Sequence, residues 1–152
     1  MKANKGFTLI ELLAVIVILA VIALIATPTI LGVIETARKG AAESSAYGYV
    51  DAVEKSIVMA EVDDTIVVLP DGTYDTADLK TAGVKVKGDY PEDGSTVVIS
   101  GNEVTKANLT FGKYNVAYDA SNDDAAQVVE SFTAQTVTMT CTASECKAKS
   151  AE

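Results

Sequence analysis

The hydrophobic residues divide the chain into an apolar N-terminal rod and a polar remainder. From Leu12 to Ile34 there are 23 consecutive residues without a charged side chain, and most of them are Leu, Ile, Val or Ala. At ~1.5 Å per residue, a helix of this length spans about 35 Å, which is enough to cross a bilayer. Beyond Ile34 the chain is rich in Asp, Thr, Ser and Gly. The pattern predicts a membrane-spanning helix followed by a polar domain.

The helical pattern continues past the apolar run without a Gly-Pro break. Small or apolar residues recur there at three- or four-residue spacing, with charged residues mostly between them. They form two sets, which are Val33, Ala37, Ala41, Ser44 and Gly48, and Ala46, Tyr49, Val53, Ile57 and Ala60. The spacing predicts one helix from about Phe7 to about Glu61, with an amphipathic second half.

After Val62 the pattern changes to that of strands and turns. Thr65–Leu69 is β-branched, which predicts a strand, and it ends in the turn signal Pro70-Asp71-Gly72. Thr76–Ala82 is predicted as a short helix with Thr76 or Asp78 near its cap. Gly88-Asp89-Tyr90-Pro91-Glu92-Asp93-Gly94 is predicted as a loop.

Four further runs complete a predicted antiparallel sheet. Thr96–Ser100 and Glu103–Phe111 alternate apolar and polar residues around Gly101-Asn102, which is a hairpin signal. Lys113–Tyr118 is predicted as the next strand and Gln135–Thr142 as the last. One sheet packed on the amphipathic half of the long helix gives an α+β fold.

Composition narrows the classes of function. The formal net charge is −9, and such a surface repels phosphates, so nucleic acid binding by the bulk domain is not expected. The chain has no His, so neither a Ser-His-Asp nor a Cys-His arrangement can form. The sequence therefore predicts a protein that is not an enzyme and that has no cofactor and no metal.

The N-terminus differs from an ordinary secretory signal. Lys2 and Lys5 precede the apolar run, but that run is far longer than the ~7–15 residues of a typical signal. No small-x-small cleavage site follows it. Glu11 lies next to the apolar run, where a carboxylate costs a few kcal/mol on insertion scales unless it has a partner.

One candidate partner for Glu11 is a new α-amino group. Cleavage after Gly6 would give Phe7 a positive charge four residues before Glu11. The pair could meet within one subunit at i, i+4 spacing. In a bundle of staggered helices, Glu11 could instead pair with the Phe7 amine of a neighbour, and a buried unpaired carboxylate would then penalise every wrong stagger.

The segment Lys5-Gly6-Phe7-Thr8-Leu9-Ile10-Glu11 resembles the processing motif of type IV prepilins and of the related type II secretion pseudopilins. The resemblance implies that a membrane aspartyl prepilin peptidase cuts after Gly6 and N-methylates Phe7. Glu11 matches the hallmark glutamate of the family, and the apolar stretch through Pro28 also fits. Gly88–Asp119 loosely resembles the sheet of pilins from Gram-positive bacteria.

This resemblance implies an organisation and a set of partners. Residues 1–6 would be a cytoplasmic leader, residues 7–34 a transmembrane and filament-core helix, and residues 35–152 an extracellular pilin domain. The precursor would cross the cytoplasmic membrane once and then enter a surface pilus. Its partners would be the peptidase, identical subunits, and an assembly platform with its ATPase.

Two alternatives stay open at this point. The chain could be a pseudopilin or minor pilin of a secretion or DNA-uptake system, or a membrane-anchored extracellular binding domain. The sequence does not choose among adhesion, twitching motility, DNA uptake and secretion as the task of a filament.

Pro28 is the other predicted assembly residue. Proline lacks a backbone N–H and crowds the carbonyl four residues back, which costs ~3 kcal/mol inside a helix. Thr27 and Thr29 can partly satisfy the freed carbonyls. We expect a kink or weak point at Ala23–Pro28, and in the family this region loosens on packing into a filament.

The remaining candidate sites lie near the C-terminus. Cys141 and Cys146 are predicted to close a small hairpin loop as a disulfide, with free thiols or half of a zinc site as alternatives. The loop Asp119–Asp124 resembles a calcium loop but lacks its Gly and its closing Glu, so a solvated acidic loop is preferred. Asn108-Leu109-Thr110 fits a glycosylation sequon inside a predicted strand.

Overall fold

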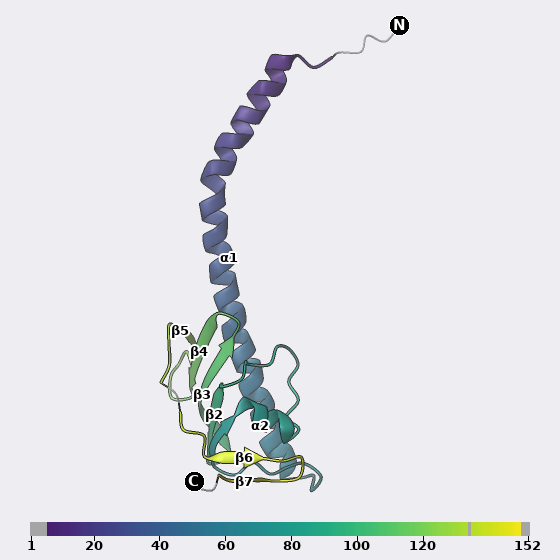
Figure 1. Ribbon diagram of the computed structural model, residues 1–152, viewed down its shortest axis with the longest axis vertical. Helices are drawn as coiled ribbons and strands as arrows, with labels where there is room; N and C mark the ends of the chain where they lie inside the picture. The colour runs from purple at the N-terminus through teal and green to yellow at the C-terminus, as the bar shows by residue number, and fades with distance from the viewer. Residues whose placement is uncertain (1–5, 134, 150–152) are drawn as a thin grey trace. The chain divides into compact units, whose positions relative to one another are not determined.

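The computed structural model describes residues 6–133 and 135–149. It divides into an N-terminal unit, Met1–Arg38, and a C-terminal unit, Lys39–Glu152, which are described separately. The elements in chain order are α1 (Leu9–Ala60), β1 (Gly72–Asp75), α2 (Thr76–Thr81), β2 (Thr96–Ser100), β3 (Glu103–Phe111), β4 (Tyr114–Asp119), β5 (Ala126–Val129), β6 (Met139–Cys141) and β7 (Cys146–Ala148) (Figure 1). The predicted α+β class is confirmed.

Helix α1 matches the predicted helix to within two residues at each end. In the C-terminal unit it buries one face, formed by Ala42, Ala46, Tyr49, Val50, Val53 and Ile57. Most of the second predicted set of small and apolar residues lies on this face. The first set is exposed throughout.

Strands β1 to β5 form one antiparallel sheet in the order β1-β2-β3-β4-β5. Each strand pairs with the next along the chain, and helix α2 with the loop after it lies in the connection between β1 and β2. At the β2–β3 turn, Gly101 and Asn102 both have φ of 66°. Two consecutive positive φ values suit a two-residue hairpin turn, which explains the choice of glycine and asparagine and confirms the predicted hairpin.

The two faces of the sheet have different neighbours. Pairing aligns Tyr74, Val97, Ala107, Tyr118 and Ala126 across the five strands, and all but the half-buried Tyr118 are buried in the core. Because side chains alternate between faces, the residues between them point to the opposite face. The buried residues of this row, from Tyr74 to Ala126, belong to the same hydrophobic core as the buried face of α1.

Two side chains of α1 satisfy the free edge of β5. The Glu43 carboxylate accepts a hydrogen bond from the backbone N–H of Val128 at 3.2 Å, and the Tyr47 hydroxyl accepts one from that of Ala126 at 3.1 Å. An edge strand with open N–H groups is a template for pairing with other chains. The helix thus covers one edge of the sheet as well as its inner face.

A third side chain of α1, the carboxylate of Glu54, reaches a backbone N–H inside the sheet. The β2–β3 register shifts between Val98 and Ile99, so the regular ladder is interrupted there. Glu54 accepts a hydrogen bond from the N–H of Val104 beside this irregularity, at 3.3 Å. The helix side chain therefore supplies a partner close to the place where the ladder fails.

Three predictions of local structure were wrong. Thr65–Leu69 is not a strand: Val67 and Leu69 are buried, but the segment pairs with no strand in the described part of the chain. The first strand is Gly72–Asp75, so Gly72 belongs to β1 and not to a turn. The cap of α2 is Asp75, whose side chain accepts from the N–H of Ala77.

The predicted last strand, Gln135–Thr142, was also wrong in extent and in pairing. Only Met139–Cys141 is a strand, and it pairs with β7 in a separate two-stranded sheet. The place of the last strand in the main sheet is taken by β5, Ala126–Val129. The sequence analysis had assigned no element to these four residues.

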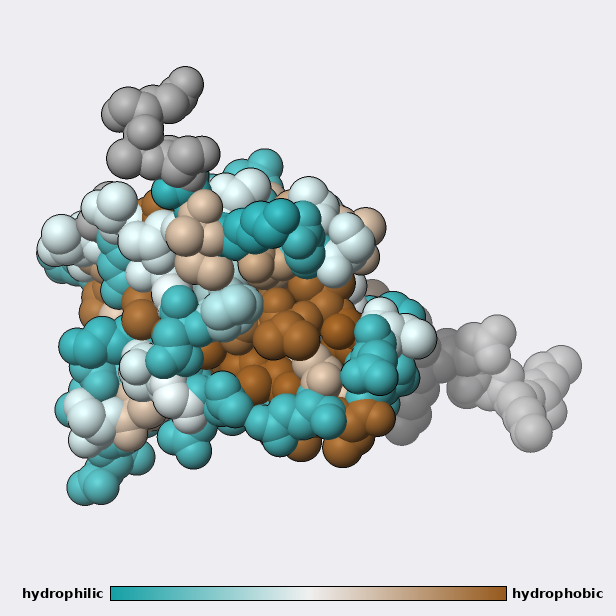
Figure 2. Space-filling model, turned by 90° about the horizontal axis from the view of Figure 1, so that it is seen from below, coloured by the Kyte–Doolittle hydropathy of each residue, from teal (hydrophilic) through white to brown (hydrophobic). Residues whose placement is uncertain are grey.

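The end of the C-terminal unit seen in Figure 2 has an apolar area bordered by hydrophilic residues. The large apolar side chains that this unit exposes most are Val58, Val62 and Val68, at 60%, 85% and 62%. They lie near the end of α1 and in the segment that follows it. Some apolar surface therefore stays open after the domain has formed.

Candidate functional site

The predicted cleavage site lies immediately before α1. Gly6, Phe7 and Thr8 belong to neither a helix nor a strand, and α1 begins at Leu9. The Phe7 side chain is 82% exposed. The Gly6–Phe7 peptide bond thus lies outside regular structure, next to an exposed side chain.

Thr8 and Glu11 close the N-terminus of α1 by reciprocal hydrogen bonds. The Glu11 Oε2 atom accepts from the backbone N–H of Thr8 at 2.9 Å and from its hydroxyl at 2.7 Å. The backbone N–H of Glu11 donates to the Thr8 Oγ1 atom at 3.3 Å. This is a capping box, in which a threonine and a glutamate three residues apart satisfy the open N–H groups of the first helical turn.

The capping box gives Glu11 a partner within the uncleaved chain. The sequence had offered only the α-amino group of Phe7, which exists after cleavage. The pattern Thr-x-x-Glu before an apolar run was visible in the sequence and predicts this box. Thr8 is therefore a site residue that the sequence reasoning missed, and the pairing of Glu11 with an amine remains a prediction.

The apolar residues of the N-terminal unit have no protein cover. The large apolar side chains between Phe7 and Ile34 are 41% to 83% exposed. Among the described residues, one helix is long and apolar enough to cross a membrane, and this is α1. An unbroken apolar surface of this length is not stable in water, so it requires lipid or other protein around it.

Pro28 lies inside α1, which continues through it. The Leu24 carbonyl would ordinarily accept from the N–H of residue 28, which proline lacks. The Thr27 hydroxyl donates to the Ala23 carbonyl at 2.7 Å, one residue earlier than the carbonyl that loses its partner. The predicted threonine hydrogen bond is thus present but does not replace the missing one.

Cys141 and Cys146 form a disulfide, as predicted. They are directly paired residues of β6 and β7, and both are buried. The alternatives of free thiols and of half a zinc site are therefore wrong.

The acidic loop has protein partners for its first carboxylate. Asp119 Oδ1 accepts from the hydroxyl and the N–H of Ser121 at 2.6 and 3.0 Å, and Asp119 Oδ2 lies 3.0 Å from the Lys106 ammonium. These hydrogen bonds and the Lys106 charge lower the pKa of Asp119 to about 2. Within residues 6–133 and 135–149, no three His, Cys, Asp or Glu side chains gather to hold a metal ion.

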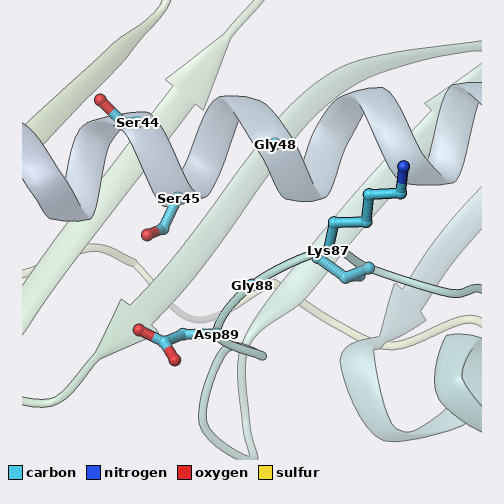
Figure 3. Close-up of a pocket in the computed structure, with 7 residues that line it drawn as sticks. Ser44, Ser45, Gly48, Lys87, Gly88 and Asp89 are labelled. Atoms are coloured by element: carbon cyan, nitrogen blue, oxygen red, sulfur yellow. The ribbon is translucent and has the colours of Figure 1, made fainter.

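A shallow pocket lies between α1 and the loop that follows α2. It is lined by Ser44, Ser45 and Gly48 of the helix and by Lys87, Gly88 and Asp89 of the loop, and Figure 3 shows the Ser45 side chain on the side of the helix nearer to Asp89 and the Ser44 side chain on the other side. The Ser45 hydroxyl donates to the Ala41 carbonyl of its own helix at 3.0 Å. The Ser45 hydroxyl is thus bonded to the backbone, and among the described residues no hydrogen bond joins it to a base, so the pocket provides no reason to infer catalysis.

Comparison with known proteins bears on the N-terminus. Residues 1–27 match the family model described as the prokaryotic N-terminal methylation motif. No match to the chain was found among curated proteins or among solved structures. The matched range contains Gly6, Phe7, Thr8 and Glu11, and together with the apolar helix it fits a membrane-anchored precursor that becomes a surface pilus. The chain therefore carries a prokaryotic N-terminal methylation motif, followed by an α+β domain whose long helix and antiparallel sheet are consistent with the type IV pilin fold.

Proposed function

We propose that this protein is a structural subunit of a type IV pilus. In this proposal, prepilin peptidase cuts the Gly6–Phe7 bond and methylates the new amine of Phe7. The processed chain then polymerises through the N-terminal part of α1, with the C-terminal unit on the filament surface.

The observation that carries the proposal is the combination of the methylation motif with an uncovered apolar helix. The motif covers residues 1–27. Helix α1 begins just after the Gly6–Phe7 bond, and no residue in its most apolar 18-residue stretch is buried. Lipid can surround this surface in the precursor, and the same surface of identical subunits can surround it in a filament. A soluble monomer has neither.

Glu11 supports assembly over simple anchoring. A membrane anchor needs no carboxylate at the start of its apolar run, where the charge is costly. In the precursor the carboxylate caps its own helix through Thr8. After cleavage the α-amino group of Phe7 supplies a charged partner, and a charged pair in a low-dielectric filament core is strongly position-dependent. Glu11 would then fix the stagger between neighbouring subunits.

The partners follow from this sequence of events. They are the peptidase at the cytoplasmic membrane, identical subunits, and an assembly platform driven by its ATPase. The methylation motif also fits a pseudopilin, and filament abundance on the cell surface separates that candidate from a major pilin. We assign no catalytic activity to the subunit.

The test is substitution of Glu11 in the cells that make the protein. Glu11→Ala removes both the cap and the charge, whereas Glu11→Gln keeps a capping acceptor and removes only the charge. Both variants are expected to be inserted into the membrane and to be absent from sheared surface filaments. Glu35→Ala, the same change further along α1, is the matched control and is expected to enter filaments.

Each outcome has a definite meaning. Loss of both Glu11 variants from filaments, with Glu35→Ala retained, supports a charge-dependent assembly step. If Glu11→Gln assembles while Glu11→Ala does not, the residue acts by capping α1 and the register role is wrong. If all variants behave as the wild type and no filament contains the chain, the protein is a membrane-anchored binding domain.

A further inference from the structure

The end of the C-terminal unit that contains the last turn of α1 is both apolar and acidic. It is formed by residues 58–71, here called the acidic end. Val58, Val62 and Val68 are 60%, 85% and 62% exposed there, and Figure 2 shows apolar area at this end with hydrophilic residues around it. The same residues include no Lys or Arg and four exposed carboxylates, which are Glu61, Asp63, Asp64 and Asp71. Exposed apolar side chains with a charged rim are typical of a contact surface.

One carboxylate of the acidic end has no task within the subunit. Asp63 accepts hydrogen bonds from the N–H and the hydroxyl of Thr65 at 2.9 and 2.6 Å. Asp71 accepts one from the N–H of Gly101 at 3.0 Å. Among the described residues, the Asp64 carboxylate has neither a hydrogen-bond nor an ion-pair partner. It is therefore available to a cation from outside the subunit.

A basic surface lies elsewhere on the same unit, in the loop after α2. Residues 82–88, here called the lysine loop, contain Lys85 and Lys87 and no Asp or Glu. Both lysines are exposed, and within the described part of the chain neither forms an ion pair, whereas Lys106 and Lys147 do. Copies of a chain with a net charge of −9 repel one another, so close packing of copies needs a local basic surface. The lysine loop supplies one.

The lysine loop borders the shallow pocket on α1 that is shown in Figure 3. Gly48 lies on the helix side of this pocket, and a Cβ added to it would meet no atom within 4 Å. Glycine inside a helix costs about 1 kcal/mol relative to alanine, and packing within the subunit does not require it here. The Lys87 side chain extends along α1 beyond Gly48, whereas Asp89 lies on the side of Ser45. The pocket thus offers room for a small apolar side chain with a cation beside it.

We propose that the acidic end of one subunit docks on the lysine loop of a second copy of the chain. Val62 would enter the space over Gly48, and Asp64 would face Lys87. The second copy is the occupant because the chain itself carries both halves of the match, in charge and in the size of the apolar group. This inference rests on the proposed function, since it places the contact between neighbouring subunits of one filament.

The contact is of the kind that builds a filament. Its two surfaces are different, so each subunit in a row still offers one free acidic end and one free lysine loop. Gly48 and Met59 lie on the same helix about 16 Å apart along its axis, so the two surfaces are displaced along α1. Each contact therefore adds a step along the helix axis and does not close a dimer.

The first experiment exchanges the charges of the contact in the cells that make the protein. Asp64→Lys and Lys87→Glu each replace attraction by repulsion, and each is expected to lower the amount of the chain in sheared surface filaments about 10-fold. The combined variant restores opposite charges and is expected to return to within about threefold of the wild type. Asp123→Lys, the same change at another exposed aspartate, is the matched control and is expected to assemble normally. Unchanged Tm values in micelles would show that each variant folds.

The second experiment maps the contact by cross-linking. A chain with both Gly48→Cys and Val62→Cys is expected to form a ladder of cross-linked multimers in oxidised filaments, because each subunit uses two different surfaces. Either substitution alone is expected to leave monomers. Cys141 and Cys146 are buried and joined to each other, so they offer no thiol.

The outcomes separate this contact from the proposed function. Rescue by the combined charge variant, together with the ladder, supports the contact. Normal assembly of both single charge variants overturns it while the filament remains, and so does failure of the combined variant to recover. Dimers from Val62→Cys alone would mean that two acidic ends meet, which also overturns it. Absence of the wild-type chain from filaments would instead refute the proposed function, and the contact would fall with it.

Discussion

Two tyrosines are buried in the core, but the hydroxyl of only one of them has a hydrogen-bond partner. Substitution by phenylalanine is therefore predicted to change the free energy of unfolding in opposite directions at the two positions. Tyr49 on α1 and Tyr74 on β1 are both 0% exposed. The Tyr74 hydroxyl donates to the Pro70 carbonyl. The Tyr49 hydroxyl has no hydrogen-bond partner in the described part of the chain. We therefore expect Tyr49→Phe to stabilise the domain and Tyr74→Phe to destabilise it.

The magnitudes follow from the state of each hydroxyl. A buried hydroxyl without a partner costs about 1–3 kcal/mol, and phenylalanine removes that penalty while keeping the ring. The Tyr49 ring keeps its edge-to-face contact with Tyr90, at 6.2 Å between centroids. Tyr49→Phe should thus raise the free energy of unfolding by about 1 kcal/mol. Tyr74→Phe should lower it by about 1 kcal/mol, because it removes a satisfied hydrogen bond.

The assay is thermal unfolding of the full chain in micelles, followed by near-ultraviolet circular dichroism of its tyrosines. A change of 1 kcal/mol shifts the Tm of a domain of this size by about 4 °C. The account predicts a rise for Tyr49→Phe and a fall for Tyr74→Phe. Equal falls for both variants would refute the reasoning, since they would mean that the Tyr49 hydroxyl is satisfied, for instance by a buried water molecule.

Three further predictions concern the same domain. Glu54→Ala leaves the N–H of Val104 without its carboxylate partner and should cost about 1–3 kcal/mol, measured by chemical denaturation against Glu54→Gln, which retains an acceptor. Gly72→Ala should cost about 1–3 kcal/mol in the same assay, because the new Cβ would come within 3 Å of the Met139 side chain, and Met139→Ala in the same chain should relieve part of the loss. Burial raises the pKa of Tyr74 to about 12, so the neutral phenol is favoured in the folded state. Its contribution to stability is complete below pH 10 and is lost as the pH rises from 10 through 12. Tyr74→Phe should make the fall of the Tm over that range shallower without removing it, because burial also raises the pKa of Tyr49 and of Tyr118.

The elements with a strong local signal were predicted well from the sequence. Helix α1 was found because its apolar run and the spacing of Tyr49, Val53 and Ile57 extend over many turns. The β2–β3 hairpin was found because Gly101-Asn102 has a turn geometry that few other residues adopt. In both cases the local sequence is enough to determine the backbone conformation.

The elements that depend on distant partners were not predicted. Thr65–Leu69 has β-branched residues, but a strand also needs a neighbour, and β2 pairs with β1 instead. The described residues between β5 and β6, 130–133 and 135–138, belong to no helix or strand, and the carbonyls of Glu130 and Thr133 accept hydrogen bonds from Asn115 and Asn108 of other strands. Asn108 had drawn attention only as part of a sequon, and its burial at 8% exposure shows that its amide serves the fold.

At the N-terminus the sequence located the motif but not its local geometry. Glu11 was recognised as a charge that needs a partner, and that partner in the uncleaved chain is Thr8. The capping box could have been predicted from Thr8 and Glu11 alone.

The most direct test of the central claim is mass analysis of the N-terminus of the protein recovered from the surface of its own cells. The account predicts a chain that begins at Phe7 and is one methyl group heavier than its sequence. A chain that keeps Met1–Gly6 after exposure to prepilin peptidase would contradict the account, and the protein would then be a membrane anchor with a capped helix and an extracellular domain.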